Sequence, residues 1–173
     1  MLTRVGRFNF YFLLACCTAV LSGCKTTEEK REAKEMTLLR IHREARANGS
    51  PAVVKVGFRS GFVASAEASP VLDERNLESA EIVEADTGFA IQLRFAQHGK
   101  LLLDQLTTEI RNRRLLIFCQ WEEGRWLAAP VFKTRVQSGY LTFTPDASRE
   151  EAIRIVRGLN NIVKQVKARG DSW

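Results

Sequence analysis

Reactive side chains are scarce in this chain of 173 residues, and their scarcity bears on several classes of function. The only two histidines, His42 and His98, lie far apart and have no cysteine or carboxylate at ligand spacing, so we expect no metal site. The sequence shows neither a glycine-rich loop suited to a phosphate nor a recognisable set of serine, histidine and acid. Asp104 and Glu109, on one predicted helix, are interpreted as a solvated pair and not as an acid–base couple. We therefore expect a protein that is not an enzyme, with no catalytic residue and no cofactor.

Cysteine is equally sparse. Three of the four cysteines, Cys16, Cys17 and Cys24, fall in the first 24 positions. The fourth, Cys119, ends the apolar run 115–119, which is typical of a buried central strand. With one cysteine left in the domain no intramolecular disulfide can form, and no nearby basic group or helix start is evident that would lower the pKa of its thiol. Cys119 is therefore interpreted as a packing residue.

A single long apolar run occurs, from Phe8 to Leu21, interrupted by Asn9 and Thr18. It is shorter than the ~20 residues that a membrane-spanning helix needs. A basic start precedes it and small residues follow it, which is the three-part pattern of a secretory signal. The sequence thus predicts an export signal over residues 1–23 and not a permanent membrane span.

The four residues Leu21-Ser22-Gly23-Cys24 resemble the lipobox of bacterial lipoproteins. The resemblance implies that the Cys24 thiol receives a diacylglyceryl group and that cleavage then exposes the Cys24 amine. Lys25 stands where an aspartate would retain such a protein at the inner membrane, so the resemblance implies the outer membrane, facing the periplasm. Three acyl chains would anchor firmly, because each buried methylene contributes ~0.8 kcal/mol. An ordinary cleaved signal and an uncleaved anchor are the alternatives.

Charge argues against a nucleic-acid partner. Without the predicted signal, 24 of the 26 basic residues remain against 20 acidic ones, and no concentrated basic groove is evident. A solvated surface is favoured over weak attraction to anionic headgroups or cell-wall polymer. Residues 25–35 alternate in charge and contain no large apolar side chain, so residues 24–36 are predicted to be the lipidated cysteine and a charged tether.

Alternating apolar and polar residues predict most of the strands. Residues 37–42 and 52–58 are expected to form a hairpin around the turn Asn48-Gly49-Ser50-Pro51, and residues 59–70 to follow as a loop or edge segment. From residue 71 on, strands are expected around Ile82 and Val83, at 89–95, at 115–119, at 125–128 and at 139–144.

Two helices complete the pattern. Apolar residues recur at helical spacing from Gly99 to Ile110, and Arg111, Arg113 and Arg114 gather near the expected end of that helix. The capping box Ser148-x-x-Glu151 begins a second amphipathic helix. The sequence therefore predicts an α+β fold in which two helices pack on one face of a mostly antiparallel sheet. This is a ferredoxin-like sandwich preceded by a β-hairpin, with domain boundaries at 37–70 and 71–169.

The stretch 72–163 resembles the head subdomain of the first large periplasmic domain of SecD, a membrane subunit that assists protein export. The landmarks that carry this resemblance are Leu77, Ala80, 89–95, Gly99, Thr107, Arg114, 115–118, Gly124, 128–130, 138–139, 150–152 and 159–160. Ser138 replaces the first glycine of a family Gly-Gly pair, and the hairpin carrying Trp121 and Trp126 is longer. No transmembrane segment follows the domain, so proton-driven translocation is not implied. The resemblance implies the fold and a role in contacting exported polypeptides or other envelope proteins.

Three aromatic residues are candidates for contact with such a partner: Trp121, Trp126 and Tyr140. Trp121 and Trp126 flank the turn 122–124, where packing across the hairpin is favoured over an exposed patch. We expect a lipid-anchored, periplasm-facing, non-catalytic interaction module, accessory to protein export or envelope assembly. The alternative is a structural envelope lipoprotein that binds cell-wall polymer or itself.

Overall fold

The computed structural model describes residues 27–47, 49–86 and 88–170. The predicted export signal and the lipobox with Cys24 lie outside these residues. The chain divides into two units, of which the first ends at Ala33 and the second begins at Lys34. In the first unit, Thr27–Glu32 within the predicted tether forms the short helix α2, which has no buried residue. Its first turn is acidic and its last turn is basic, which complements the helix dipole.

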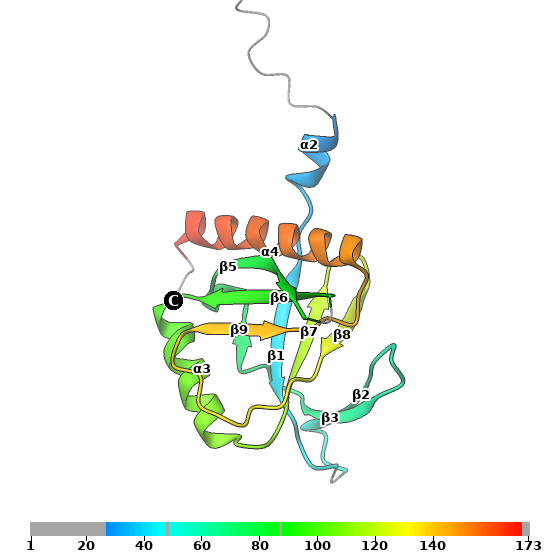
Figure 1. Ribbon diagram of the computed structural model, residues 1–173, viewed down its shortest axis with the longest axis vertical. Helices are drawn as coiled ribbons and strands as arrows, with labels where there is room; N and C mark the ends of the chain where they lie inside the picture. Colours follow the sequence, from blue (N-terminus) through cyan, green and yellow to red (C-terminus); the bar gives the residue numbers. More distant parts are fainter. Residues whose placement is uncertain (1–26, 48, 87, 171–173) are drawn as a thin grey trace, which may run out of the picture. The chain divides into compact units, whose positions relative to one another are not determined.

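Antiparallel strands and two long helices make up the second unit, which confirms the predicted α+β class. The strands that we expected in one sheet are divided between a four-stranded sheet, β4-β1-β7-β8, and a three-stranded sheet, β5-β6-β9. These sheets are shown in Figure 1, where their strands cross. The strands of the four-stranded sheet are β1 (Leu38–Arg43), β4 (Leu72–Asp73), β7 (Leu115–Gln120) and β8 (Gly124–Ala128). Those of the three-stranded sheet are β5 (Leu77–Ala85), β6 (Gly88–Phe95) and β9 (Tyr140–Phe143).

The expected hairpin between residues 37–42 and 52–58 does not form, and a different hairpin occurs in this region. β2 (Val53–Gly57) pairs with β3 (Val63–Glu67), which lies in the segment expected to be a loop or edge. The strand expected to be its partner, β1, instead pairs with β7 over six residues and with β4. Alternation identifies a strand by its own residues and carries no information about its neighbour, which explains the wrong partner.

One apolar core fills the space between the two large sheets and the helices. Its fully buried side chains include Ile41 of β1, Leu93 of β6 and Ile117 of β7. Helix α3 (Gln97–Glu109) contributes Leu103, and helix α4 (Arg149–Arg169) contributes Ile155. The core therefore joins both sheets into one structure.

Helix α4 begins where the capping box predicts. The Ser148 hydroxyl accepts from the Glu151 N–H at 3.2 Å, and the Glu151 carboxylate accepts from the Ser148 N–H at 2.9 Å. Helix α3 ends at Glu109, so the three arginines that follow lie beyond its last turn. Two of them, Arg113 and Arg114, bind Glu44 at the end of β1 and thereby join the chain after α3 to the four-stranded sheet.

Candidate functional site

The edges of the sheets differ in whether another group binds their outward-directed backbone N–H and C=O groups. We call an edge closed where these groups have partners and open where they do not. At β5, a side-chain amide of α4 closes the edge. The Ala80 N–H donates to Asn160 Oδ1 at 2.9 Å, and Asn160 Nδ2 donates to the Ala80 carbonyl at 2.8 Å. One amide thus makes the pair of hydrogen bonds that a neighbouring strand would make.

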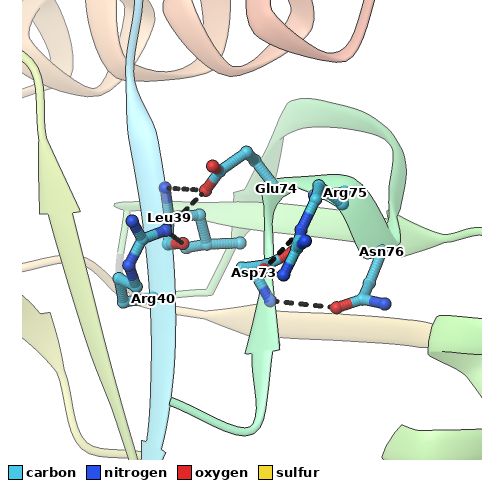
Figure 2. A network of polar contacts seen from close by, with 6 residues as sticks. All are labelled: Leu39, Arg40, Asp73, Glu74, Arg75 and Asn76. Carbon is cyan, nitrogen blue, oxygen red and sulfur yellow. Dashed lines mark hydrogen bonds and ion pairs between the residues drawn. The ribbon is translucent and has the colours of Figure 1, made fainter. Parts of the chain in front are cut away.

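A carboxylate closes the edge of β1 where its partner β4 ends. The Leu39 N–H donates to Glu74 Oε2 at 3.2 Å, and Arg40 Nη1 donates to the same oxygen at 3.0 Å (Figure 2). Glu74 begins the short 3-10 helix η1 (Glu74–Asn76), in which Asp73 and Asn76 form a capping box. The Glu74 side chain is only 12% exposed, so it serves as a buried extension of the sheet.

The outer edge of β8 is closed as well. The Asp146 N–H donates to the Leu127 carbonyl at 2.7 Å. Beside it, Arg125 Nη2 forms an ion pair with Glu151 Oε2 at 2.9 Å, which ties β8 to the start of α4. A turn and a helix therefore cover this edge.

The edge of β9 is open. The Phe95 N–H donates to the Gly139 carbonyl at 2.9 Å, which makes residues 95 and 139 a hydrogen-bonded pair of the ladder. Because such pairs recur every two residues, Leu141 and Phe143 direct their backbone groups to β6. Tyr140 and Thr142 then direct theirs to the free edge. The Tyr140 N–H donates to Ser138 Oγ at 3.2 Å, while the Thr142 N–H and both carbonyls have no partner among the described residues.

A cleft of about 580 Å³ runs along this open edge. One wall is β9, from Tyr140 to Thr142, and the other is the loop 131–138. The loop is held on α3, because the Val136 N–H donates to Thr107 Oγ1 at 2.9 Å and the Arg135 guanidinium forms two contacts with the Asp104 carboxylate. The loop therefore forms a fixed wall beside the unpaired backbone of β9.

The Asp104–Arg135 pair also decides the role of Asp104. Its hydrogen bonds from Arg135 lower the pKa of the Asp104 carboxyl below its ordinary value. Glu109, on the same helix, pairs with Arg43 at 3.2 Å. The two carboxylates thus serve separate ion pairs.

A second open edge belongs to β2. Its hydrogen-bonded pairs with β3 leave the backbone groups of Val53, Lys55 and Gly57 directed outward. Lys55 is exposed at the centre of this edge, and a lysine there discourages strand pairing. Because Lys55 interrupts this edge, whereas a cleft runs along the unpaired backbone of β9, the β9 edge is the better candidate site.

The three predicted contact residues have different surroundings. Trp126 packs across the hairpin on Phe118, with ring centroids 5.3 Å apart, and on His42 at 5.2 Å. Trp121 packs against the main core and lies under the Arg125 guanidinium at 4.8 Å. Tyr140 alone belongs to the open edge, and its side chain is exposed. As partner contacts, all three residues stay predictions.

The other two side chains that could take part in chemistry, Cys119 and His42, are both buried. Cys119 is buried, and the loss of solvent raises the pKa of its thiol well above its ordinary range. His42 is also buried, its Nδ1 lying 2.8 Å from the Glu67 carbonyl. In residues 27–47, 49–86 and 88–170, no cluster of histidine, cysteine and carboxylate side chains could hold a metal ion. No helix within those same ranges has the length and apolar character of a membrane span.

Solved structures with a similar fold come from SecDF. One is described as a membrane component that enhances protein export, and its TM-score is 0.57 at 17% identity, covering 82% of this chain and 71% of that one. Another is SecDF in a super-membrane-facing form, with a TM-score of 0.60 at 16% identity, covering 79% of this chain and 21% of that one.

These likenesses confirm the SecD resemblance at the level of the fold. Identities of 17% and 16% show the fold alone, and this chain spans about a fifth of the longer structure, where the covered share is 21%. No protein-family model and no curated protein matches the sequence.

Proposed function

We propose that this protein is a non-catalytic interaction module that binds an extended segment of another polypeptide along the open edge of β9. The observation that carries the proposal is the contrast between edges. Side chains or turns occupy the edges of β1, β5 and β8, whereas β9 offers unpaired backbone groups beside a cleft. An extended peptide adds to such an edge through main-chain hydrogen bonds and places few demands on sequence.

The cleft also predicts a pattern in the bound segment. Its backbone would pair with the outward groups of Tyr140 and Thr142. Side chains of an added strand alternate between the two faces of the sheet. Those on the inner face would meet Phe132 and Val136, which pack against the core, and those on the outer face would meet Tyr140 and Thr142. We therefore expect segments in which apolar residues alternate with polar ones.

The cellular setting of the proposal is the bacterial envelope. A lipid on Cys24 would hold the domain at a membrane, facing the periplasm, with the outer membrane favoured by Lys25. The similar fold in SecDF, which is described as enhancing protein export, supports an accessory role in export or envelope assembly. In this role the protein would bind translocating polypeptides or other envelope proteins.

Photo-crosslinking in intact cells tests the binding proposal. A photoreactive residue at Tyr140 should give protein adducts, whereas one at Leu101, which is 58% exposed on α3, should give only background. A third position, Trp126, tests whether the β7–β8 hairpin also contacts a partner. Equal yields from Tyr140 and Leu101 would refute the proposal. An adduct of twice the protein's mass would identify a second copy as the occupant, which is the self-binding alternative.

A backbone variant adds a sharper test. Thr142→Pro removes an N–H that points away from β6, so the ladder survives and the bound strand loses one hydrogen bond. Lys55→Pro makes the same change at the edge of β2 and is the matched control. We expect Thr142→Pro to lower the adduct yield from Tyr140 and Lys55→Pro to leave it unchanged. Equal effects of both substitutions would contradict the choice of the β9 edge.

The anchor has a test of its own. Cys24→Ala should abolish fatty-acid labelling and release the protein from membranes. Persistent labelling of this variant would overturn the lipoprotein assignment without affecting the binding proposal.

A further inference from the structure

Carboxylates pair with most arginines of the unit that begins at Lys34. The paired arginines are Arg40, Arg43, Arg59, Arg75, Arg94, Arg114, Arg125, Arg135, Arg149, Arg154 and Arg157. Of the arginines described in this unit, four make no ion pair, and one of these, Arg169, lies in the last turn of α4. The other three, Arg46, Arg111 and Arg113, belong to the segments just after β1 and α3. Arg46 and Arg113 thus carry positive charges that no ion pair among the described residues neutralises.

A cleft of about 400 Å³ lies beside these two arginines. Arg46 and Arg113 line it, together with Ser50, Ser69 and Glu67. Alanines and a valine complete the wall, so the arginines, the serines and Glu67 are its polar lining. The cleft is distinct from the one along β9, with which it shares no lining residue.

Two carboxylates belong to this region. Glu67 lines the cleft without an ion pair to either arginine, and Glu44 serves another partner. The Glu44 carboxylate pairs with Arg114 at 3.3 Å, and only the Glu44 carbonyl accepts from Arg113. That backbone contact holds the Arg113 guanidinium in position without neutralising its charge. It also leaves further N–H groups of the guanidinium for a ligand, because a guanidinium carries five of them.

The arginines that follow α3 lie in a turn with a constrained backbone. Asn112, between Arg111 and Arg113, has φ of 63°, and it is the one non-glycine residue with positive φ in the described chain. Asparagine tolerates this left-handed conformation better than most residues. The turn is fixed to the loop after β8, since the Asn112 N–H donates to the Phe132 carbonyl at 2.8 Å.

We propose that this cleft binds a phosphate group. Guanidinium forks match the oxygens of phosphate bidentately, and two of them with the Ser69 hydroxyl supply more donors than the two oxygens of a carboxylate would use. The Glu67 carboxylate in the same cleft weakens binding through repulsion, so removing its charge should strengthen it. The phosphate comes from a phospholipid headgroup or from a soluble phosphate. The proposal is independent of strand binding at β9.

Calorimetric titration of the full-length protein in a neutral detergent tests the cleft. The probes are sodium phosphate and glycerophosphoglycerol, the soluble headgroup of phosphatidylglycerol, with sodium chloride at equal ionic strength as the blank. Arg113→Gln and Arg46→Gln should each weaken phosphate binding by about ten-fold, as expected for the loss of a charge-assisted contact. Arg169→Gln removes the same charge from an exposed arginine elsewhere and should change the affinity by less than about two-fold. Glu67→Gln should raise the affinity.

The outcomes separate the ligand sources. Stronger binding of glycerophosphoglycerol than of phosphate, with the same response to Arg46→Gln, identifies a lipid headgroup. The reverse order identifies a soluble phosphate. Absence of binding heat with both probes would overturn the proposal, and so would an equal loss in Arg113→Gln, Arg46→Gln and Arg169→Gln, because net charge alone would then explain the binding.

Discussion

Replacing Asn160 by alanine should destabilise the domain more than any nearby polar substitution on α4. The change removes both hydrogen bonds at the edge of β5, one from the Ala80 N–H and one to the Ala80 carbonyl. Ala80 is only 5% exposed, so water replaces these partners poorly. A buried backbone group without a partner costs about 1–3 kcal/mol, and two such groups cost about 2–4 kcal/mol after partial relaxation.

One effect opposes this loss. Alanine favours a helix interior over asparagine by about 0.6 kcal/mol. We therefore expect Asn160→Ala to lower the free energy of unfolding by about 1.5–3.5 kcal/mol, which corresponds to several degrees in Tm. Gln165→Ala, an exposed substitution on the same helix, should stay within about 0.5 kcal/mol of wild type and is the matched control.

Urea unfolding followed by circular dichroism measures both variants. The slope of the unfolding free energy against urea should stay unchanged, which would show that stability and not compactness has changed. A loss below about 0.5 kcal/mol in Asn160→Ala would refute the view that this amide closes the edge of β5.

Three further predictions follow from buried contacts. In Gly158→Ala, the new Cβ would lie 2.2 Å from Thr37 Oγ1. The free energy of unfolding, measured in urea, should fall by about 1–2 kcal/mol even after the gain in helix propensity. Adding Thr37→Ala should restore part of this loss. Burial lowers the pKa of His42 below 6.5, so the unfolded chain takes up the proton first as the pH falls. Stability should therefore decrease below about pH 6.5 in wild type and in His98→Gln, and less in His42→Gln, when unfolding is measured from pH 8 to pH 5. The Cys119 thiol should react with iodoacetamide only in denaturant, and rapid labelling of the folded protein would contradict its burial.

Local patterns predicted the elements whose signals lie within a few residues. The alternation from Phe89 to Phe95 marks β6, and the Ser148 capping box marks the start of α4. β3 was missed because Val63–Glu67 consists mostly of small residues whose pattern is weak. β4 has two residues, which is too short for any periodicity. Local patterns do not predict which strands pair, because β1 pairs with β7, which is far away in the sequence.

The candidate site depended on contacts that no local pattern contains. Tyr140 could be chosen from its place in an alternating strand, but nothing in that strand tells whether its edge is open. The answer depends on the loop 131–138, which is held away from β9 on α3. The closed edges depend on equally distant residues, since Asn160 lies 80 positions from Ala80.

The two edges of the three-stranded sheet therefore have opposite roles. β5 and β9 flank β6, so a strand added at β9 extends the sheet on the side away from the amide of Asn160. With β5 closed, the sheet can accept one additional strand at β9 and cannot grow in both directions. Because the two edges differ in this way, variants at β5 and at β9 should affect different properties, stability and binding respectively. Asn160→Ala removes the side chain that is bonded to β5 and should cost stability, whereas Thr142→Pro alters the open edge and should cost binding while the fold remains intact.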